Sequence, residues 1–387
     1  MSALTVAALA VGFVLLVAGG ESLVRGASRL AGTLGISPLV VGLTVVAFAT
    51  STPELAVSVD AALSGHPGLA VGNVVGSNIA NILLILGLTA LIAPLVAKSR
   101  IVRVDIPIMV GFSIVLLLVA LDGVISSLNG LLLLAGVVAY VVATVVISRK
   151  RSADPIPTPT DTEQGGSAGE GAGVGADDEQ SSDDGASHSA LKSSALVALG
   201  VLMLVVGARL LVTAASDLAA AWGMSDLVIG LTVVAIGTSL PELATSLVAA
   251  YRGERDLAVG NIVGSNVFNI GAVLGITSLI TPIEVAAGAI RFDLPIMVAV
   301  ALALLPIAFT GMAITRWEGL VFTGFYAAYI LYVVLQASDH DALEPFSTAM
   351  LWFVIPFTAL WLIVLATYEL GVLRGRRQAR RHLVPEE

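Results

Sequence analysis

The segment VVAFATSTPEL, residues 45–55, places a glutamate in an otherwise apolar stretch of the chain. Almost the same letters return as VVAIGTSLPEL at residues 233–243. Each copy lies within an apolar segment long enough for a helix to cross a lipid bilayer, which takes roughly 20 residues. A carboxylate at that depth is costly and is rare unless it has a role. The two segments therefore predict a membrane-spanning fold with polar residues in its interior.

The composition agrees with a chain that lies mostly in lipid. Of its 387 residues, 57% are hydrophobic and 12% are charged, whereas a soluble domain carries about 25% charged residues. Cysteine is absent, which excludes disulfides and thiolate metal ligands. These values predict an all-α, multi-pass protein of the cell membrane. Its apolar segments lie near 3–24, 38–63, 69–93, 103–121, 127–148, 191–220, 227–250, 257–281, 292–310, 317–337 and 346–373.

Five of these segments precede a polar break, five follow it and one is additional. The break is rich in Pro, Gly, Ser and acidic residues, a composition typical of disorder. Lys and Arg occur in alternate loops, a bias that places the N-terminus outside the cell and the break in the cytoplasm. The sequence thus predicts a first five-helix repeat (1–148), a disordered acidic cytoplasmic linker (149–190), a second five-helix repeat (191–337), and an extra transmembrane helix with a basic cytoplasmic tail (338–387).

The two halves are copies of one another. Shifted by 188 residues, 42–95 aligns with 230–283 without a gap, and 33 of 54 positions are identical. Because each repeat has an odd number of helices, the second copy must enter the membrane upside down relative to the first. A ten-helix inverted 5+5 repeat is typical of secondary transporters, whose ion sites lie near the bilayer midplane between the repeats.

The letters shared by the copies include polar residues at helical spacing. Thr50, Ser51 and Glu54 are three or four residues apart and share one helix face. Pro53 cannot donate a backbone hydrogen bond, so we expect a kink that frees carbonyl oxygens beside the glutamate. The candidate ion-binding side chains are Thr50, Ser51, Glu54, Ser77 and Asn81 in the first copy and Thr238, Ser239, Glu242, Ser265 and Asn269 in the second.

This donor set consists entirely of oxygen atoms and carries a formal charge of −2 from its two glutamates. Hard cations prefer such ligands, and Ca²⁺ takes about 6 to 8 oxygens in flexible geometry. Softer metals favour His or Cys, which these segments lack. A cation, or protons, would relieve the repulsion between the two carboxylates. No cofactor and no nucleic-acid partner are expected; the partners are the transported ions and the lipid bilayer.

Other polar and small residues in these segments favour structural roles. Four glycines, Gly72, Gly76, Gly260 and Gly264, form small-residue stripes that allow close helix packing. Asn78 and Asn266 lie off the face of the candidate ligands and are expected to cap or pack. Asp105 and Asp293 are next to Arg103 and Arg291 near helix starts, which predicts two structural charge pairs.

Together, the motifs carry a resemblance to a known family. GLTVVAFATSTPEL with GNVVGSNIANI, and GLTVVAIGTSLPEL with GNIVGSNVFNI, resemble the two α-repeats of the cation/calcium exchanger superfamily, in its prokaryotic sodium/calcium exchanger branch. The resemblance covers residues 1–337 apart from the linker. It implies a ten-helix inverted-repeat fold in which the first helix of each repeat slides against the core that holds the ions.

The resemblance also implies roles for individual residues. Glu54 and Glu242 would bind the central divalent ion. The side chains of Thr50, Ser51, Thr238 and Ser239, with the backbone carbonyls of Ala47 and Ala235, would serve Na⁺ or the same ion. Ser77, Asn81, Ser265 and Asn269 would complete the ring of ligands.

The identity of the counter-ion is less clearly marked. Where the sodium-coupled members have an Asp, this chain has Asn269, a feature similar to proton-coupled antiporters. The latter usually have a GNxxE pattern around the glutamate, whereas this chain has TSxPE. The sequence therefore favours exchange of Ca²⁺ for Na⁺, with H⁺-coupled exchange as the alternative. A passive cation channel fits the closed two-fold site less well, and the core has no His, Lys or Cys base for an intramembrane enzyme.

Overall fold

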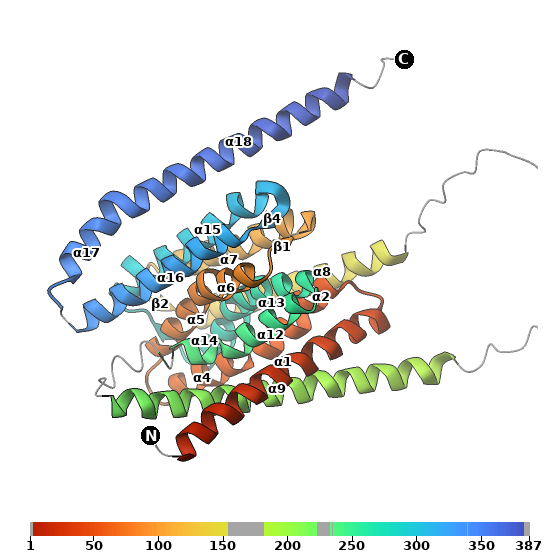
Figure 1. Ribbon diagram of the computed structural model, residues 1–387, viewed down its shortest axis with the longest axis horizontal. Helices are drawn as coiled ribbons and strands as arrows, with labels where there is room; N and C mark the ends of the chain where they lie inside the picture. The colour runs from red at the N-terminus through yellow and green to blue at the C-terminus, as the bar shows by residue number, and fades with distance from the viewer. Residues whose placement is uncertain are drawn as a thin grey trace, which may run out of the picture.

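Helices account for nearly all of the chain. The computed structural model describes residues 3–96, 98–153, 182–222, 233, 235–338 and 340–382, and Figure 1 shows a helical bundle with one further helix crossing its edge. Within those ranges, ten helices are long and apolar enough to span a bilayer. The predicted segment 227–250 is described at 233 and from Ala235 onward, where two further helices lie. The predicted all-α, multi-pass fold is confirmed.

The first repeat runs from Ala3 to Ala153 and contains several helices that change pitch. Its segments near Glu54 and Asn81 each join α-helix to a wider π-helix. The elements are α1 (Ala3–Leu34), α2 (Pro38–Val41), η1 (Gly42–Val46), α3 (Ala47–Thr50), α4 (Thr52–Leu63), α5 (Gly68–Ala80), η2 (Asn81–Leu86), α6 (Gly87–Ile92), β1 (Leu95–Val96), η3 (Ile101–Asp105), α7 (Ile106–Val119), β2 (Val124–Ile125) and α8 (Ser127–Ala153).

The second repeat follows the same order, and the extra helix comes after it. Its elements are α9 (Ser182–Ala221), α11 (Ala235–Thr238), α12 (Leu240–Tyr251), α13 (Arg255–Phe268), η5 (Asn269–Leu274), α14 (Gly275–Ile280), β3 (Ile283–Glu284), η6 (Ala289–Asp293), α15 (Leu294–Phe309), η7 (Thr310–Met312), β4 (Ala313–Ile314) and α16 (Arg316–Ala337). The C-terminal elements are α17 (Leu343–Ala349), η8 (Met350–Val354) and α18 (Ile355–His382).

Local sequence signals explain where several of these helices begin and turn. The Ser37 side chain accepts a hydrogen bond from the Val40 N–H at the start of α2, and Pro38 occupies the first turn. Thr315 and Glu318 form a reciprocal capping box at the start of α16. Gly65 and Gly253, at equivalent positions after α4 and α12, have φ of 81° and 82°. Glycine adopts such left-handed turns without the steric cost of a side chain.

The long helices α1 and α9 form an antiparallel pair along one flank of the bundle (Figure 1). A Cβ atom on Gly12 would lie 2.9 Å from the carbonyl oxygen of Gly207, and one on Gly19 would lie 2.9 Å from that of Gly200. Gly12 and Gly200 are repeat mates, as are Gly19 and Gly207. Each mate therefore makes the contact that the two-fold relation requires, as in an inverted repeat.

The two repeats also exchange packing partners throughout the bundle. Strand β1 pairs antiparallel with β4, with Leu95 opposite Ile314, and β2 pairs with β3, with Ile125 opposite Ile283. Helix α8 packs against α14 of the other repeat, and α16 packs against α6 in the equivalent way. Because each repeat completes the other's core, neither forms a separate hydrophobic unit.

The ends of the predicted linker are helical. Helix α8 continues to Ala153 and α9 begins at Ser182, so helix extends into both ends of the range 149–190. The centre of that range, 154–181, lies outside the described residues. The division into four parts, and the disorder of the linker, stay predictions.

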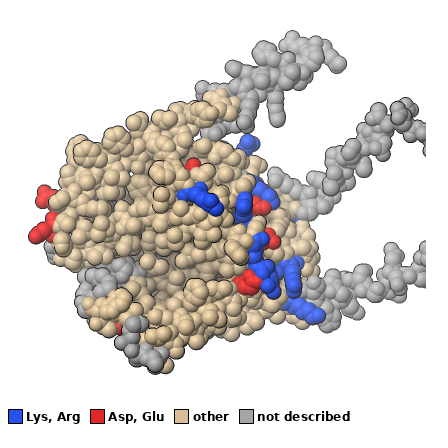
Figure 2. Space-filling model, viewed as in Figure 1, with Lys and Arg blue, Asp and Glu red and all other residues tan. Residues whose placement is uncertain are grey.

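Basic side chains gather at one end of the molecule, where α8 ends and α9 begins (Figure 2). Ion pairs there join the two repeats: Lys98 contacts Asp256, and Arg252 contacts Glu21. The opposite end of this face shows acidic side chains. This asymmetry matches the loop charges from which the sequence predicts the cytoplasmic side, and the orientation itself stays a prediction.

Candidate ion-binding site

The two glutamates of the repeated motif lie at matching breaks in their helices. Helix α3 ends before Ser51 (φ −79°, ψ 1°), and α4 then begins with Glu54 in its first turn. Ser239 (φ −89°, ψ 5°) separates α11 from α12 in the same way, with Glu242 in the first turn. A proline in each first turn lacks the donor that would continue the preceding helix. Each carboxylate thus occupies a helix N-terminus, whose partial positive charge favours an anion.

Both glutamate side chains are 0% exposed, and their carboxylates are close enough to interact electrostatically. Neither carboxylate makes a hydrogen bond within the described part of the chain. The hydroxyls of Thr50 and Ser265 lie beside the Glu242 carboxylate, although without normal hydrogen-bond geometry. Buried polar atoms in proteins are almost always hydrogen-bonded, so each exception calls for an explanation. The explanation is a site whose lone pairs await a ligand.

Several other candidate ligands share this property. They are buried, and the atoms concerned have no hydrogen-bond partner among the described residues: Ser51 Oγ, Ser77 Oγ, both amide atoms of Asn81, Ser239 Oγ and Asn269 Oδ1. With the glutamates, these atoms come from both repeats and from four helical segments. A cluster of unpartnered, buried oxygen atoms around two carboxylates offers a coordination shell of the kind that hard cations use.

Thr50 and Ser265 connect the two repeats directly. The Thr50 hydroxyl donates to Asn261 Oδ1 at 3.1 Å and lies 3.3 Å from Ser265 Oγ. All three residues are buried. The first helix break is therefore fixed against α13 of the other repeat.

The remaining candidates occupy equivalent backbone positions. Ala47 and Ala235 begin α3 and α11. The Ala47 carbonyl accepts the Ser51 N–H at 3.0 Å and lies 3.4 Å from the Thr50 hydroxyl, so it is already engaged. Thr238 ends α11 and is half-buried.

Asn81 and Asn269 each begin a π-helix, η2 and η5. Such wider turns often occur at functional sites. The Asn269 amide nitrogen donates to Asn78 Oδ1 at 3.1 Å. Asn78 thus holds a candidate ligand in place, in agreement with its expected packing role.

Four residues around the site were missed by the sequence prediction. The Asn73 amide donates to Ser58 Oγ at 3.0 Å and to the Glu54 carbonyl at 3.2 Å. Its repeat mate, Asn261, donates to Ser246 Oγ at 3.1 Å. The signal was available, because Asn73 and Asn261 lie four residues before Ser77 and Ser265 and share their helix face.

The glycine stripes and acid–base pairs had mixed outcomes. A Cβ on Gly264 would lie 2.7 Å from Ala47 Cβ, and one on Gly260 would lie 2.8 Å from the Leu39 carbonyl, so close packing in the second copy is confirmed. The predicted pairing of Asp105 with Arg103 is wrong. Asp105 faces Arg100, whose Nε is 3.7 Å away, and accepts a hydrogen bond from Tyr140.

The predicted pairing of Asp293 with Arg291 is also wrong, because Asp293 accepts instead from the Tyr329 hydroxyl at 3.1 Å, while Arg291 is exposed. In an α-helix, side chains two positions apart point in different directions.

The arrangement can do restricted chemistry. Within the described residues, no group of three or more His, Cys, Asp and Glu could hold a metal ion. The site therefore relies on two carboxylates and neutral oxygens. Such a donor set suits hard cations that bind and leave, whereas softer transition metals favour His and Cys ligands.

Comparisons with known proteins agree with this arrangement. A family model described as sodium/calcium exchanger protein matches residues 4–146 and 192–335. The putative antiporter CaxA of Alkalimonas amylolytica is 39% identical over 295 residues, which cover 76% of this chain and 86% of that one. The sodium/calcium exchanger MaX1 of Methanosarcina acetivorans is 35% identical over 346 residues, covering 84% and 96%.

Solved structures of the sodium–calcium exchanger NCX_Mj share the fold. One, soaked with 2.5 mM Na⁺ and 0.1 mM Ca²⁺, superposes with a TM-score of 0.69 at 32% identity and covers 86% of this chain and 99% of that chain. This match confirms the predicted inverted-repeat fold. The chain belongs to the sodium/calcium exchanger family, whose members are cation antiporters of the cell membrane and not enzymes.

Proposed function

We propose that this protein exchanges Ca²⁺ for Na⁺ by alternating access, with Glu54 and Glu242 as the counter-charges of the transported ions. One observation carries the proposal. Both oxygens of each buried carboxylate lack a hydrogen-bond partner within the described residues, and buried oxygens of other candidate ligands around them share that lack. Carboxylates in that state are costly, and a bound cation offsets the cost.

The ligands proposed for the ions are those named from the sequence. Glu54 and Glu242 bind the divalent ion, and Ser51, Ser77, Asn81, Ser239, Asn269, Thr50, Ser265 and Thr238 supply neutral oxygens, with the carbonyls of Ala47 and Ala235. Removing a cation from this cage leaves two close carboxylates, which repel. The cage therefore favours exchange of one load of charge for another.

Charge balance separates the two possible counter-ions. Against a site charge of −2, one Ca²⁺ or two H⁺ leaves no net charge, whereas three Na⁺ leave one positive charge. Sodium coupling at that ratio moves charge across the membrane, and proton coupling at two per Ca²⁺ does not. The TSxPE pattern and the relatives named sodium/calcium exchangers favour sodium.

Proton coupling is the second candidate because of Asn269. The sodium-coupled pattern has a carboxylate at this position, and here the amide nitrogen is committed to Asn78. A neutral residue removes one charge that a third Na⁺ would otherwise balance.

The experiment is ⁴⁵Ca²⁺ uptake into proteoliposomes that contain the full chain. An outward Na⁺ gradient at equal pH should drive uptake, and a membrane potential should alter its rate. A pH gradient without Na⁺ should not. Uptake driven by the pH gradient alone would replace sodium with protons, and no uptake under either gradient would contradict Ca²⁺ exchange.

A further inference from the structure

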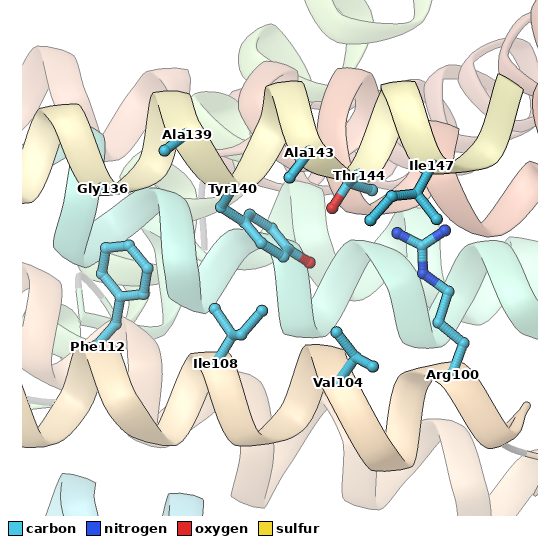
Figure 3. Close-up of a pocket in the computed structure, with 10 residues that line it drawn as sticks. All are labelled: Arg100, Val104, Ile108, Phe112, Gly136, Ala139, Tyr140, Ala143, Thr144 and Ile147. Atoms are coloured by element: carbon cyan, nitrogen blue, oxygen red, sulfur yellow. The ribbon is translucent and has the colours of Figure 1, made fainter. Parts of the chain in front are cut away.

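A cavity of about 430 Å³ lies away from the ion site, between the α7 segment and α8. In Figure 3, Val104, Ile108 and Phe112 form one wall, and the small residues Gly136, Ala139 and Ala143 face them. This volume is within the range of ligand pockets, about 300–1,000 Å³. The walls are apolar over most of their length, so the cavity suits a hydrocarbon chain.

The only charged residue that lines this cavity is Arg100, at one end. Its side chain is 15% exposed and its Nε is 3.7 Å from Asp105 Oδ2. The guanidinium points across the groove toward α8 near Ile147, and the Tyr140 hydroxyl points toward the same end (Figure 3). In the part of the chain that the structure describes, no hydrogen bond from this guanidinium meets the usual geometry. An arginine fork in this setting has donors to spare, and phosphate is a matching acceptor.

The other repeat shows how the same place is filled when it is not open. Val104 corresponds to Phe292 and Ala143 corresponds to Tyr332. The rings of Phe292 and Tyr332 stack with centroids 4.3 Å apart, and Phe292 also stacks on Tyr329, the mate of Tyr140. Arg100 corresponds to Gly288. The second repeat thus has aromatic rings where the first has small side chains, and no cation at its mouth.

The position of Arg100 relative to the membrane completes the argument. It directly precedes the apolar span Ile101–Val119 and lies at the end where basic side chains gather (Figure 2). Arg103, Arg149 and Lys150 of the same two segments are exposed. Residues at the end of a span lie at the level of the lipid headgroups, where basic clusters attract anionic lipids.

We propose that this groove is a specific site for one anionic phospholipid, with an acyl chain between the α7 segment and α8 and its phosphate on Arg100. The lipid supplies the acceptor that Arg100 lacks and fills the space that Phe292 and Tyr332 fill in the other repeat. A free phosphate would leave the apolar part of the groove empty, so the acyl chain is part of the ligand.

The test is native mass spectrometry of the delipidated full chain titrated with dioleoylphosphatidylglycerol. Wild type should bind one molecule more tightly than the rest. Arg100→Gln should weaken that binding at least about tenfold, the scale of a lost charge-assisted hydrogen bond. Arg103→Gln removes the same charge nearby from a residue that does not line the cavity, and should change binding less than about twofold.

A second variant tests the groove itself. Val104→Phe with Ala143→Tyr copies the second repeat and should abolish the tight lipid, while dioleoylphosphatidylcholine binding stays as weak as in wild type. Thermal unfolding in lipid-free detergent shows whether each variant is folded. Equal losses from Arg100→Gln and Arg103→Gln, unchanged binding in the folded groove-filled variant, or competition by millimolar inorganic phosphate would overturn the proposal.

Discussion

Asn78 donates a hydrogen bond from Nδ2 to the backbone carbonyl of Asn266 at 3.3 Å, and Asn266 is its own repeat mate. Two mates that touch must lie at the pseudo-two-fold axis. The contact is not reciprocal, because the Asn266 amide donates instead to Ile262 of its own helix at 2.7 Å. Asn78 also accepts from Asn269. The axis therefore passes beside the candidate ion site, and the two halves of that site are held differently.

Replacing either glutamate by glutamine should abolish exchange. Glu54→Gln or Glu242→Gln halves the negative charge available to a divalent ion. We expect loss of Na⁺-driven ⁴⁵Ca²⁺ uptake and loss of the Ca²⁺-dependent rise in melting temperature, since a ligand stabilises only a state that binds it. Glu284→Gln, at an exposed position on β3, is the control and should keep both. A Ca²⁺-dependent rise retained in both glutamine variants would contradict the assigned ligands.

Asn269→Asp should destabilise the ion-free protein more than Asn81→Asp does. The Asn269 amide donates to Asn78, so an aspartate there sets two acceptors against each other. The Asn81 amide has no partner among the described residues, so its replacement breaks no hydrogen bond. The difference should be roughly 1–3 kcal/mol in the free energy of unfolding, measured by denaturant titration without Na⁺ or Ca²⁺. Equal losses would show that the Asn78 contact adds nothing.

Thr50→Val should weaken the junction between the repeats. Valine keeps the shape of threonine but leaves Asn261 Oδ1 without the donor that now lies 3.1 Å away. Leaving a buried acceptor unpaired costs about 1–3 kcal/mol. Thr52→Val is the matched control, because Thr52 is exposed and bonds only within its own helix turn, to Phe48. Thermal unfolding should separate the two variants, and similar melting temperatures would contradict a structural role for Thr50.

The sequence predicted the fold and the candidate ligands because both depend on regular spacing. Apolar runs of spanning length predict the helices, and a shift of 188 residues aligns the repeats. Residues four apart share a helix face, so Ser77 and Asn81 could be grouped with Glu54 through the repeat. No three-dimensional information was needed for these inferences.

The rest depended on departures from regular spacing. The π-helices that begin at Asn81 and Asn269 rotate the residues that follow, and a 3.6-residue period does not predict them. Asp105 contacts Arg100 five positions away and not its near neighbour Arg103, because η3 is also a π-helix. The open groove by α8 depends on which side chains fill the space between two helices, a property of packing and not of pattern.

The last prediction concerns the ion pair between Arg252 and Glu21. Glu21 is on α1, the helix that the family resemblance assigns to sliding, and Arg252 follows α12 of the ion-binding core. Arg252→Gln should favour the alternative position of α1. A partly exposed pair contributes about 0.2–1 kcal/mol, so the ratio of the two access states should change by no more than roughly fivefold. High salt should reduce the effect.

Glu21 also pairs with Arg25 on its own helix at 2.5 Å, which provides the control. Arg25→Gln removes an equal charge from Glu21 without removing a link between α1 and α12. Single-molecule fluorescence between labels on α1 and α12 should therefore change its state populations in Arg252→Gln at low salt and stay close to wild type in Arg25→Gln. The exchange of charges in Glu21→Arg with Arg252→Glu should restore the wild-type populations. Equal effects of the two single variants would show that local charge, and not the bridge between the moving helix and the core, sets the balance.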